Sequence, residues 1–315
     1  MLCFVVWLAP HTVAHAQAYP VKPIRIIVGF APGGGTDVTA RAIAQHLSDR
    51  LGQRVVVDNR PGADGVVGTD IVAKSPADGY TLLMVNSGHA VNPGMYKKLP
   101  YDTLRDFAPV TLVAMIANLL VVHPSLPVAS VAEFVRLAKA RPGAINYASG
   151  GYGSSAHLAV ELFKKVTRTD LVHVPYKSGG LVATALLAGE VEISFNTIPS
   201  LISYVKAGRL RALGVSTLQR SLSVPAVPTI AEMGYPGFSA SGLAGIVAPA
   251  GTRLEVVDRI HMEVASLLKQ AAVVERFVAL GLEPVGNTPA EFDQFIRNDT
   301  EKWKQLIREL KINLQ

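Results

Sequence analysis

The stretch IIVGFAPGGGTDVTARAIAQHL (residues 26–47) decides the fold, because it reads as a strand, a glycine loop and a helix in succession. Its first residues form a short apolar run, typical of a parallel strand buried on both faces. Ile43, Leu47 and Leu51 then recur every four residues, which predicts a helix, and Gly52 suits its C-terminal cap. The glycines leave backbone N–H groups accessible at a helix N-terminus, which favours an anion site.

The same alternation continues along the chain. Further strands are expected at 54–58, 80–86, 118–123, 145–149, 171–175, 191–195 and 210–216, and further helices at 65–74, 130–140, 155–166, 180–188, 199–207, 253–270 and from 288. Two helices begin with a capping box, formed by Ser130 with Glu133 and by Thr288 with Glu291. The pattern predicts an α/β fold of two similar halves.

The composition indicates a globular protein with many turns. The 315 residues include 27 glycines and 20 prolines, and 49% are hydrophobic against 17% charged. The formal net charge of +6 is spread along the chain without a nucleic-acid-binding module, so binding to nucleic acid is not expected. No predicted helix carries an H-x-x-x-H motif. Neither a metal site nor a cofactor is therefore expected.

The N-terminal segment MLCFVVWLAPHTVAHAQA (residues 1–18) differs from the rest of the chain. An apolar run without the usual basic start is followed by two small-x-small patterns. We expect a signal peptide that is cleaved after Ala16 or Ala18; the alternative is a buried N-terminal helix. Cys3, the single cysteine, lies in this segment, so the mature chain would have no disulfide and no thiolate metal ligand. No later run reaches ~18 apolar residues, so stable membrane insertion is not expected.

Three segments combine a strand end, glycines and a helix start. They are residues 33–37, 148–157 and 174–180, which read GGGTD, ASGGYGSSAH and VPYKSGG. In open α/β sheets, ligands bind beyond the carboxyl ends of the strands, where helix N-termini offer N–H groups and positive dipole ends. We therefore expect the three segments to face one cleft.

Two enzyme-like motifs in these segments are incomplete. Residues 29–36 nearly match a phosphate-binding loop, but Gly35 stands where the lysine belongs, which argues against a nucleotide. Ser155 and His157 suggest a serine hydrolase, yet residues two apart on a helix do not face each other. A serine cap and a packed histidine are the simpler interpretation, so no catalytic residue is assigned. Asp37 stays open between a helix cap and a ligand contact.

Longer motifs resemble a known family. They read, in order, IIVGFAPGGGTDVTAR, VVVDNRPGADGVVGTDIVAKSPADGYTLL, NPGMYKKLPYD, RDFAPVTLVA, VHVPYK and VPTIAEMGYPGF. These motifs resemble the Bug receptors, the substrate-binding proteins of tripartite tricarboxylate transporters. The resemblance implies a two-lobed α/β periplasmic binding protein of type II, with the ligand cleft between the lobes and a hinge of crossing strands.

The resemblance also implies a function and a domain division. Such a periplasmic receptor captures a small carboxylate and delivers it to transporter subunits in the membrane, or acts in sensing without transport; we expect a monomer. Turn-rich segments predict crossings between the halves near 112–120 and 225–245. One lobe would comprise residues 19–115 plus 230–315, and the other 116–229.

By position, the resemblance assigns ligand contacts to the glycine loops and to strand ends. They are Phe30, Ala31, Gly33, Gly34, Thr36, Asp37, Ser87, His89, Ser149, Gly153, Ser154, Ser155, His157, Tyr176, Lys177 and Asn196. Asn196 stands where family members often have an aspartate, so a ligand with an ammonium group becomes less favourable. Leu243 stands where they often have a tryptophan, so the pocket is expected to differ in shape.

Overall fold

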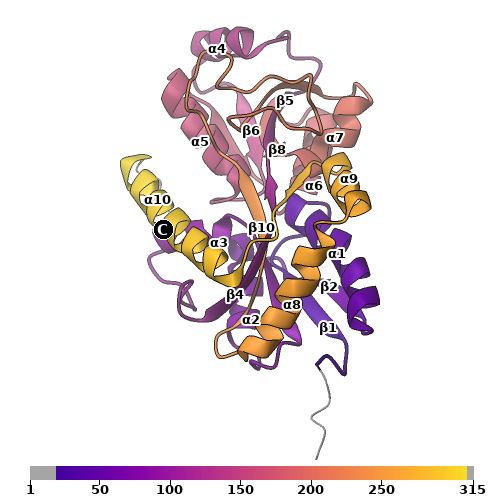
Figure 1. Cartoon of the computed structure of the whole chain (residues 1–315). Helices are drawn as coiled ribbons and strands as arrows, with labels where there is room; N and C mark the ends of the chain where they lie inside the picture. The colour runs from indigo at the N-terminus through magenta and orange to yellow at the C-terminus, as the bar shows by residue number, and fades with distance from the viewer. Residues whose placement is uncertain (1–18, 311–315) are drawn as a thin grey trace, which may run out of the picture.

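The structure, a computed structural model, describes residues 19–310 and contains two α/β units, each built on its own sheet (Figure 1). The first sheet consists of β1 (Ile24–Val28), β2 (Val55–Asn59), β3 (Thr81–Val85), β4 (Phe107–Ile116), β10 (Gly242–Pro249) and β11 (Leu282–Pro284). The second consists of β5 (Asn118–Val122), β6 (Asn146–Ser149), β7 (Val172–Pro175), β8 (Ile193–Thr197) and β9 (Arg211–Val215). This architecture confirms the predicted two-lobed α/β fold. The predicted signal peptide lies outside the described residues.

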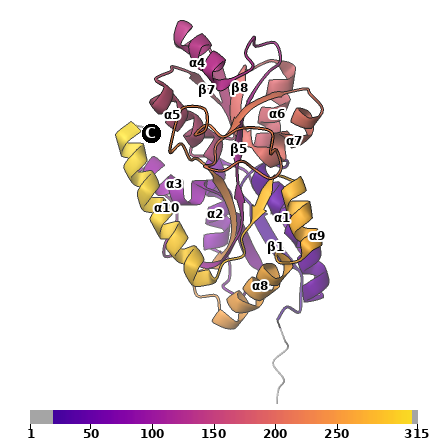
Figure 2. The same ribbon diagram turned by 45° about the horizontal axis from the view of Figure 1, so that its top comes forward.

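Helices cover both sheets. The helices of the first unit are α1 (Gly35–Leu51), the 3₁₀-helix η1 (Ala63–Gly65), α2 (Val66–Ala73), α3 (Gly88–Met95), α8 (Leu254–Leu267), α9 (Ala271–Ala279) and α10 (Pro289–Leu310). Those of the second are α4 (Val131–Ala140), α5 (Ser155–Thr167), α6 (Gly179–Ala188) and α7 (Ile198–Lys206). Figures 1 and 2 show α10 along one side of the molecule, from the first unit towards α5 of the second.

Each sheet combines parallel strands with antiparallel ones. The strand order is β11-β4-β10-β3-β1-β2 in the first sheet and β7-β6-β8-β5-β9 in the second. The pairs of β1 with β2 and β3 are parallel, as are those of β6 with β7 and β8. The strands β10 and β5 run antiparallel to their neighbours. The carboxyl ends of the parallel strands therefore lie at one edge of each sheet.

The chain passes between the sheets at two places. Ala117 alone separates β4 of the first sheet from β5 of the second, and β10 brings the chain back. Ile230 and Phe238 pack in the core of the second sheet, although the predicted division gave residues from 230 onward to the first lobe. The lobe boundaries stay a prediction, and this packing favours a return nearer Gly242.

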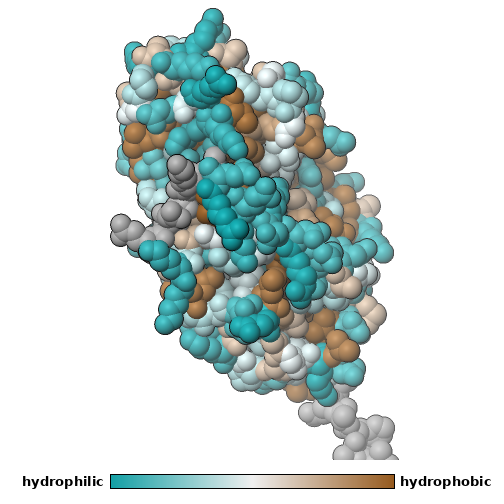
Figure 3. Space-filling model, turned by 90° about the vertical axis from the view of Figure 1, so that its left-hand side faces the viewer, coloured by the Kyte–Doolittle hydropathy of each residue, from teal (hydrophilic) through white to brown (hydrophobic). Residues whose placement is uncertain are grey.

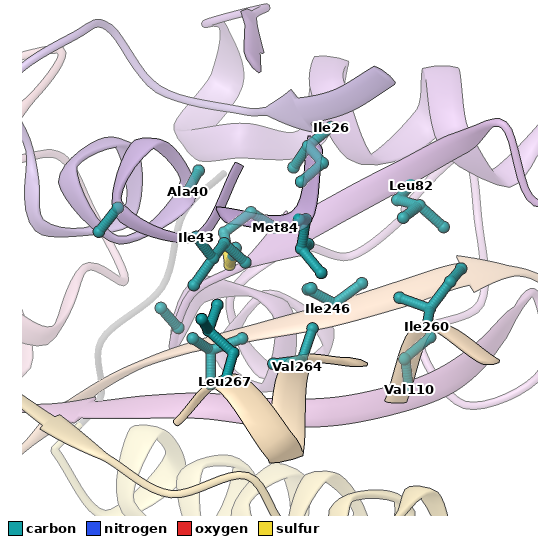
Figure 4. Packing of buried hydrophobic residues seen from close by; sticks show 14 of the residues in the cluster. Ile26, Ala40, Ile43, Leu82, Met84, Val110, Ile246, Ile260, Val264 and Leu267 are labelled. Carbon is teal, nitrogen blue, oxygen red and sulfur yellow. The ribbon is translucent and has the colours of Figure 1, made fainter. Parts of the chain in front are cut away.

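The core of the first unit explains why the opening stretch folds as it does. Figure 4 shows Ile26 of β1, Ile43 of α1 and Leu267 of α8 within one apolar cluster. All three side chains are at most 1% exposed. Complete burial of such a side chain stabilises the fold by about 1.5–3 kcal/mol relative to exposure. The apolar run of β1 and the four-residue spacing of α1 thus meet in the same core.

The structure confirms the main helix signals and adds elements that the pattern missed. Gly52 caps α1 with a left-handed φ of 64°, and Ser130 Oγ accepts a hydrogen bond from the backbone N of Glu133 at 3.2 Å. The elements missed are α3, α9, β4, β10 and β11. Helix α3 was not predicted, because Pro93 and Gly94 disfavour a helix. Strands β4 and β10 were not predicted, because they lie in or next to the segments that were taken as crossings.

Among residues 19–310, no helix combines the length and the apolar character that a membrane span requires. The face on the side of α10 is mainly hydrophilic, with scattered apolar residues (Figure 3).

We predict that Gly245→Ala destabilises the first unit, because a Cβ at this position in β10 would overlap the ring of Phe292 in α10. Overpacking of this kind typically lowers the free energy of unfolding by about 1–3 kcal/mol. Urea denaturation measures the effect. In a double-mutant cycle with Phe292→Leu, the two losses should be less than additive. An unchanged urea midpoint in Gly245→Ala would contradict this account of the packing.

Candidate functional site

A cavity that is partly open to solvent lies where loops from the two sheets meet, and its space, including its open part, is about 510 Å³. Its lining residues are Phe30, Gly34, Gly35, Thr36, Asn86, Ser87, Ile116, Gly150, Ser154, Ser155, Ala156, Ser178, Gly179, Asn196, Thr197, Gly242 and Leu243. Many of them follow the carboxyl ends of β1, β3 and β6. None of these lining residues has a charged side chain. A ligand here would therefore meet backbone groups, hydroxyls and amides rather than a counter-ion.

Within residues 19–310, five helices begin at this cavity. The lining residues at or next to their first positions are Gly35 for α1, Ser87 for α3, Ser155 for α5, Gly179 for α6 and Thr197 for α7. The first turn of a helix leaves N–H groups without intrahelical partners, and the helix dipole places about half a positive charge there. The cavity is therefore electropositive without a cationic side chain, which is the chemistry of an anion site.

Glycines bring the two units into contact beside the cavity. A Cβ on Gly180, at the start of α6, would lie 3.1 Å from the carbonyl O of Pro32 in the β1–α1 loop. Ser200 Oγ of α7 donates a hydrogen bond to the carbonyl O of Gly33 at 3.3 Å. The glycine loop thus has two roles: it leaves N–H groups accessible, and it lets the start of α1 approach the starts of α6 and α7.

Asp37 holds the first glycine loop rather than lining the cavity. Its Oδ2 accepts a hydrogen bond from the backbone N of Gly33 at 3.0 Å, and Arg41 Nε donates to Oδ1 at 3.0 Å. Asn59 Nδ2 donates to Asp37 Oδ1 at 3.0 Å and to the carbonyl O of Phe30 at 2.9 Å. The N-cap of α1 is Gly34, without a side-chain cap. Asp37 therefore fixes the loop from within the first turn of α1.

The start of α5 shows a serine cap and no catalytic pair. Ser154 is the N-cap, and its Oγ accepts a hydrogen bond from the backbone N of His157 at 3.2 Å. Ser155 lines the cavity, but its hydroxyl donates to Asn118 Oδ1 at 3.1 Å. His157 Nδ1 accepts a hydrogen bond from the backbone N of Gly153 at 3.2 Å. The imidazole is thus engaged with the loop and not with Ser155.

A pair of stacked histidines supports this second loop. The rings of His157 and His173 lie 4.6 Å apart with an interplanar angle of 29°. His173 Nε2 is 2.6 Å from Ser149 Oγ, which also accepts a hydrogen bond from the backbone N of Gly151. Burial, with a smaller contribution from Lys164, lowers the pKa of His157 to about 4. Burial and the neighbouring His157 lower the pKa of His173 to about 3. Both rings are therefore neutral near pH 7.

Side chains also fix the starts of α6 and α7. Ser178 caps α6 by accepting a hydrogen bond from the backbone N of Leu181. Asn196 Nδ2 donates to the carbonyl O of Gly179 at 2.9 Å, and its Oδ1 accepts from the backbone N of Thr197 at 2.8 Å. Asn196 therefore ties together two helix starts at the cavity.

The structure brings part of the predicted set together. The predicted ligand contacts that line the cavity are Phe30, Gly34, Thr36, Ser87, Ser154, Ser155 and Asn196. Those that do not line it are Ala31, Gly33, Asp37, His89, Ser149, Gly153, His157, Tyr176 and Lys177. Lining residues without an earlier role include Asn86, Ile116, Ala156 and Gly242. Asn86 adjoins Ser87 and could have been found, whereas Ile116 and Gly242 belong to β4 and β10, which were missed. Which residues contact a ligand stays a prediction.

We predict that acid destabilises the chain through the histidine pair. In the unfolded chain both histidines titrate near their usual pKa of ~6.5. As the pH falls from ~6.5 to ~4, the unfolded state takes up protons that the native state does not bind. The free energy of unfolding should then fall by up to about 1.4 kcal/mol per pH unit for each histidine, and this loss should level off below the lowered native pKa values. Thermal melts between pH 7 and pH 4 measure the slope.

The variant His157→Gln should reduce this slope, because one of the two neutral imidazoles is gone. The matched control is His123→Gln, since His123 bonds Ser125 at the end of β5, away from the pair. The stability of His123→Gln should depend on pH with the same slope as that of the parent protein. Equal slopes for all three proteins would contradict the assignment.

Comparisons with known proteins identify the family of the chain. The chain matches the family described as "TctC: Tripartite tricarboxylate transporter family receptor" over residues 39–312. BugT of Bordetella pertussis is 42% identical over 296 residues, which cover 93% of this chain and 91% of that protein. The structure described as "R. palustris Rpa4515 with adipate" matches with a TM-score of 0.92 and 36% identity, covering 94% of this chain and 100% of that one.

A second solved structure is MatC (Rpa3494) from Rhodopseudomonas palustris with bound malate. It matches with a TM-score of 0.86 and 29% identity, covering 92% of this chain and 100% of that one. The resemblance to the Bug receptors is thereby confirmed. The chain belongs to the tripartite tricarboxylate transporter receptor family of solute-binding proteins.

Proposed function

We propose that the chain captures a small carboxylate in the cavity between its two units and delivers it, in the periplasm, to a tripartite tricarboxylate-type transporter. The observation that carries the proposal is the convergence of five helix starts on a cavity whose lining has no charged side chain. The relatives described with adipate and malate support a carboxylate. The protein acts as a monomeric receptor and not as an enzyme. The hydrogen bonds that engage Ser155 and His157 with other partners support the absence of a catalytic pair.

One carboxylate is held at the starts of α1 and α3, and another polar group of the ligand at α5 and α6. Ser87 supports this placement, because the residue lines the cavity and its buried Oγ has no hydrogen-bond partner among the described residues. Each helix dipole contributes about 0.3–1 kcal/mol. Micromolar affinity needs about 8 kcal/mol, so direct hydrogen bonds to N–H and hydroxyl groups supply the rest.

The ligand carries no ammonium group at the end of the cavity that Asn196 lines. Both polar atoms of the Asn196 amide are already engaged with Gly179 and Thr197. No carboxylate stands among the lining residues to pair with a cation. A ligand ammonium would therefore lie among helix N-termini without a counter-charge, which is unfavourable.

We predict that simple carboxylates raise the melting temperature and that Gly34→Val reduces this effect. Gly34 lines the cavity with a φ of −81°, which valine can adopt, so the new side chain fills the ligand's space without backbone strain. A panel of mono-, di- and tricarboxylates and amino acids is screened by thermal shift, and calorimetry gives the dissociation constants. We expect the affinity to fall at least about tenfold, a loss of about 1.4 kcal/mol.

The matched control is Ala31→Val, in the same loop but not among the lining residues, which should keep the parent affinity. If amino acids raised the melting temperature and plain dicarboxylates did not, the inference from Asn196 that the ligand has no ammonium group would be wrong. Hydrolysis of an ester panel that disappears in Ser155→Ala would instead favour the serine hydrolase.

A further inference from the structure

Phe30 lies at the junction of three cavities. The first is the cavity described above, which we call the inner cavity. The second, the outer cavity, has about 790 Å³ of space including the part open to solvent, and Tyr176 and Lys177 are in its lining. A smaller one of about 240 Å³ includes His89. Among residues 19–310, Phe30 is the one residue that lines all three, and the inner and outer cavities otherwise share only Gly150. Phe30 and Gly150 therefore lie at the boundary between inner and outer cavity.

The backbone at Phe30 is fixed, and the partly buried side chain packs against the apolar core of the first unit. Its carbonyl O accepts a hydrogen bond from Asn59 Nδ2 at 2.9 Å. The ring lies against Gly65 of η1, where a Cβ would come within 3.0 Å of a ring carbon. Gly65 has a φ of 90°, so both its conformation and its missing side chain favour glycine. The ring is thus held between the core of the first unit and the backbone of Gly65, at a residue that lines both cavities.

The outer cavity differs from the inner one in charge. Of its described lining residues, Asp64 and Lys177 are charged. The Asp64 carboxylate accepts a hydrogen bond from Tyr96 OH at 3.2 Å, and burial raises its pKa. Lys177 is exposed and carries the one ammonium group that lines either cavity in the described chain. An acid that extended past Phe30 would therefore bring its far carboxylate towards Lys177.

We propose that Phe30 sets the length of the acid that the protein accepts. This inference rests on the proposed function. The ring closes the inner cavity, so the native protein selects acids that fit within it. Removal of the ring joins the two cavities and admits longer α,ω-dicarboxylates, whose second carboxylate then meets Lys177.

The test is a chain-length series measured by calorimetry. Dicarboxylates from succinate to suberate and the monocarboxylates of equal length are titrated into the parent protein, Phe30→Leu, Phe30→Ala and Phe30→Ala/Lys177→Met. In the parent protein, affinity should fall once the chain exceeds the inner cavity. In Phe30→Ala it should keep rising, by about fourfold for each further methylene buried. Phe30→Leu should lie between them, and it keeps the test open if the alanine variant does not fold.

The double variant separates the two parts of the proposal. It should lose the gain for long dicarboxylates and keep it for long monocarboxylates, because only the former present a charge to Lys177. A parent protein that binds acids, with Phe30 variants that keep its length profile, would overturn this inference and leave the proposed function standing. Equal effects of Lys177→Met on both acid series would overturn the role of Lys177. A parent protein that binds no acid at all would overturn the proposed function, and this inference with it.

Discussion

The convergence of helix N-termini on one small cavity is the constraint on which the rest of the structure depends. Each of the five ends carries about half a positive charge, and ends of the same sign repel each other at short range. An anion between them removes this repulsion and satisfies N–H groups that have no intrahelical partner. A bound anion would therefore favour the arrangement in which the two units lie close together, just as any ligand favours the conformation that it binds better.

Such an approach is possible only where side chains are absent. Gly180 meets the carbonyl of Pro32 across the boundary, and Gly35 meets the side chain of Thr197 closely enough that a Cβ would lie 3.0 Å from its Oγ1. A bulkier residue at these positions would hold the helix starts apart. The same small residues thus expose the N–H groups and permit the contact between units that concentrates them.

Charged and titratable groups stand behind the cavity and position its loops. Asp37 bonds the backbone of Gly33 and pairs with Arg41 without lining the cavity. His157 and His173 support the second loop as neutral, stacked rings: His157 Nδ1 accepts a hydrogen bond from the backbone N of Gly153, and His173 Nε2 shares a hydrogen bond with Ser149 Oγ. A charged lining would fix one ligand charge pattern, whereas backbone dipoles leave the far end of the ligand to be selected by shape.

The sequence by itself determined the strand–glycine–helix units, since an apolar run, a glycine loop and a four-residue stripe depend only on local spacing. The Ser130 capping box and the Gly52 cap could be predicted for the same reason, since each depends on residues close together in the sequence. The local pattern also placed Ser154 and Gly34 at helix starts. The long strands β4 and β10 could not be separated from turns in this way, because their burial comes from neighbours distant in the chain. With them, Ile116 and Gly242 at the cavity were missed. Only the tertiary structure decided that Asp37 and His157 lie behind the cavity and that Phe30 divides it from the next, because side chains on one loop point in directions that packing selects.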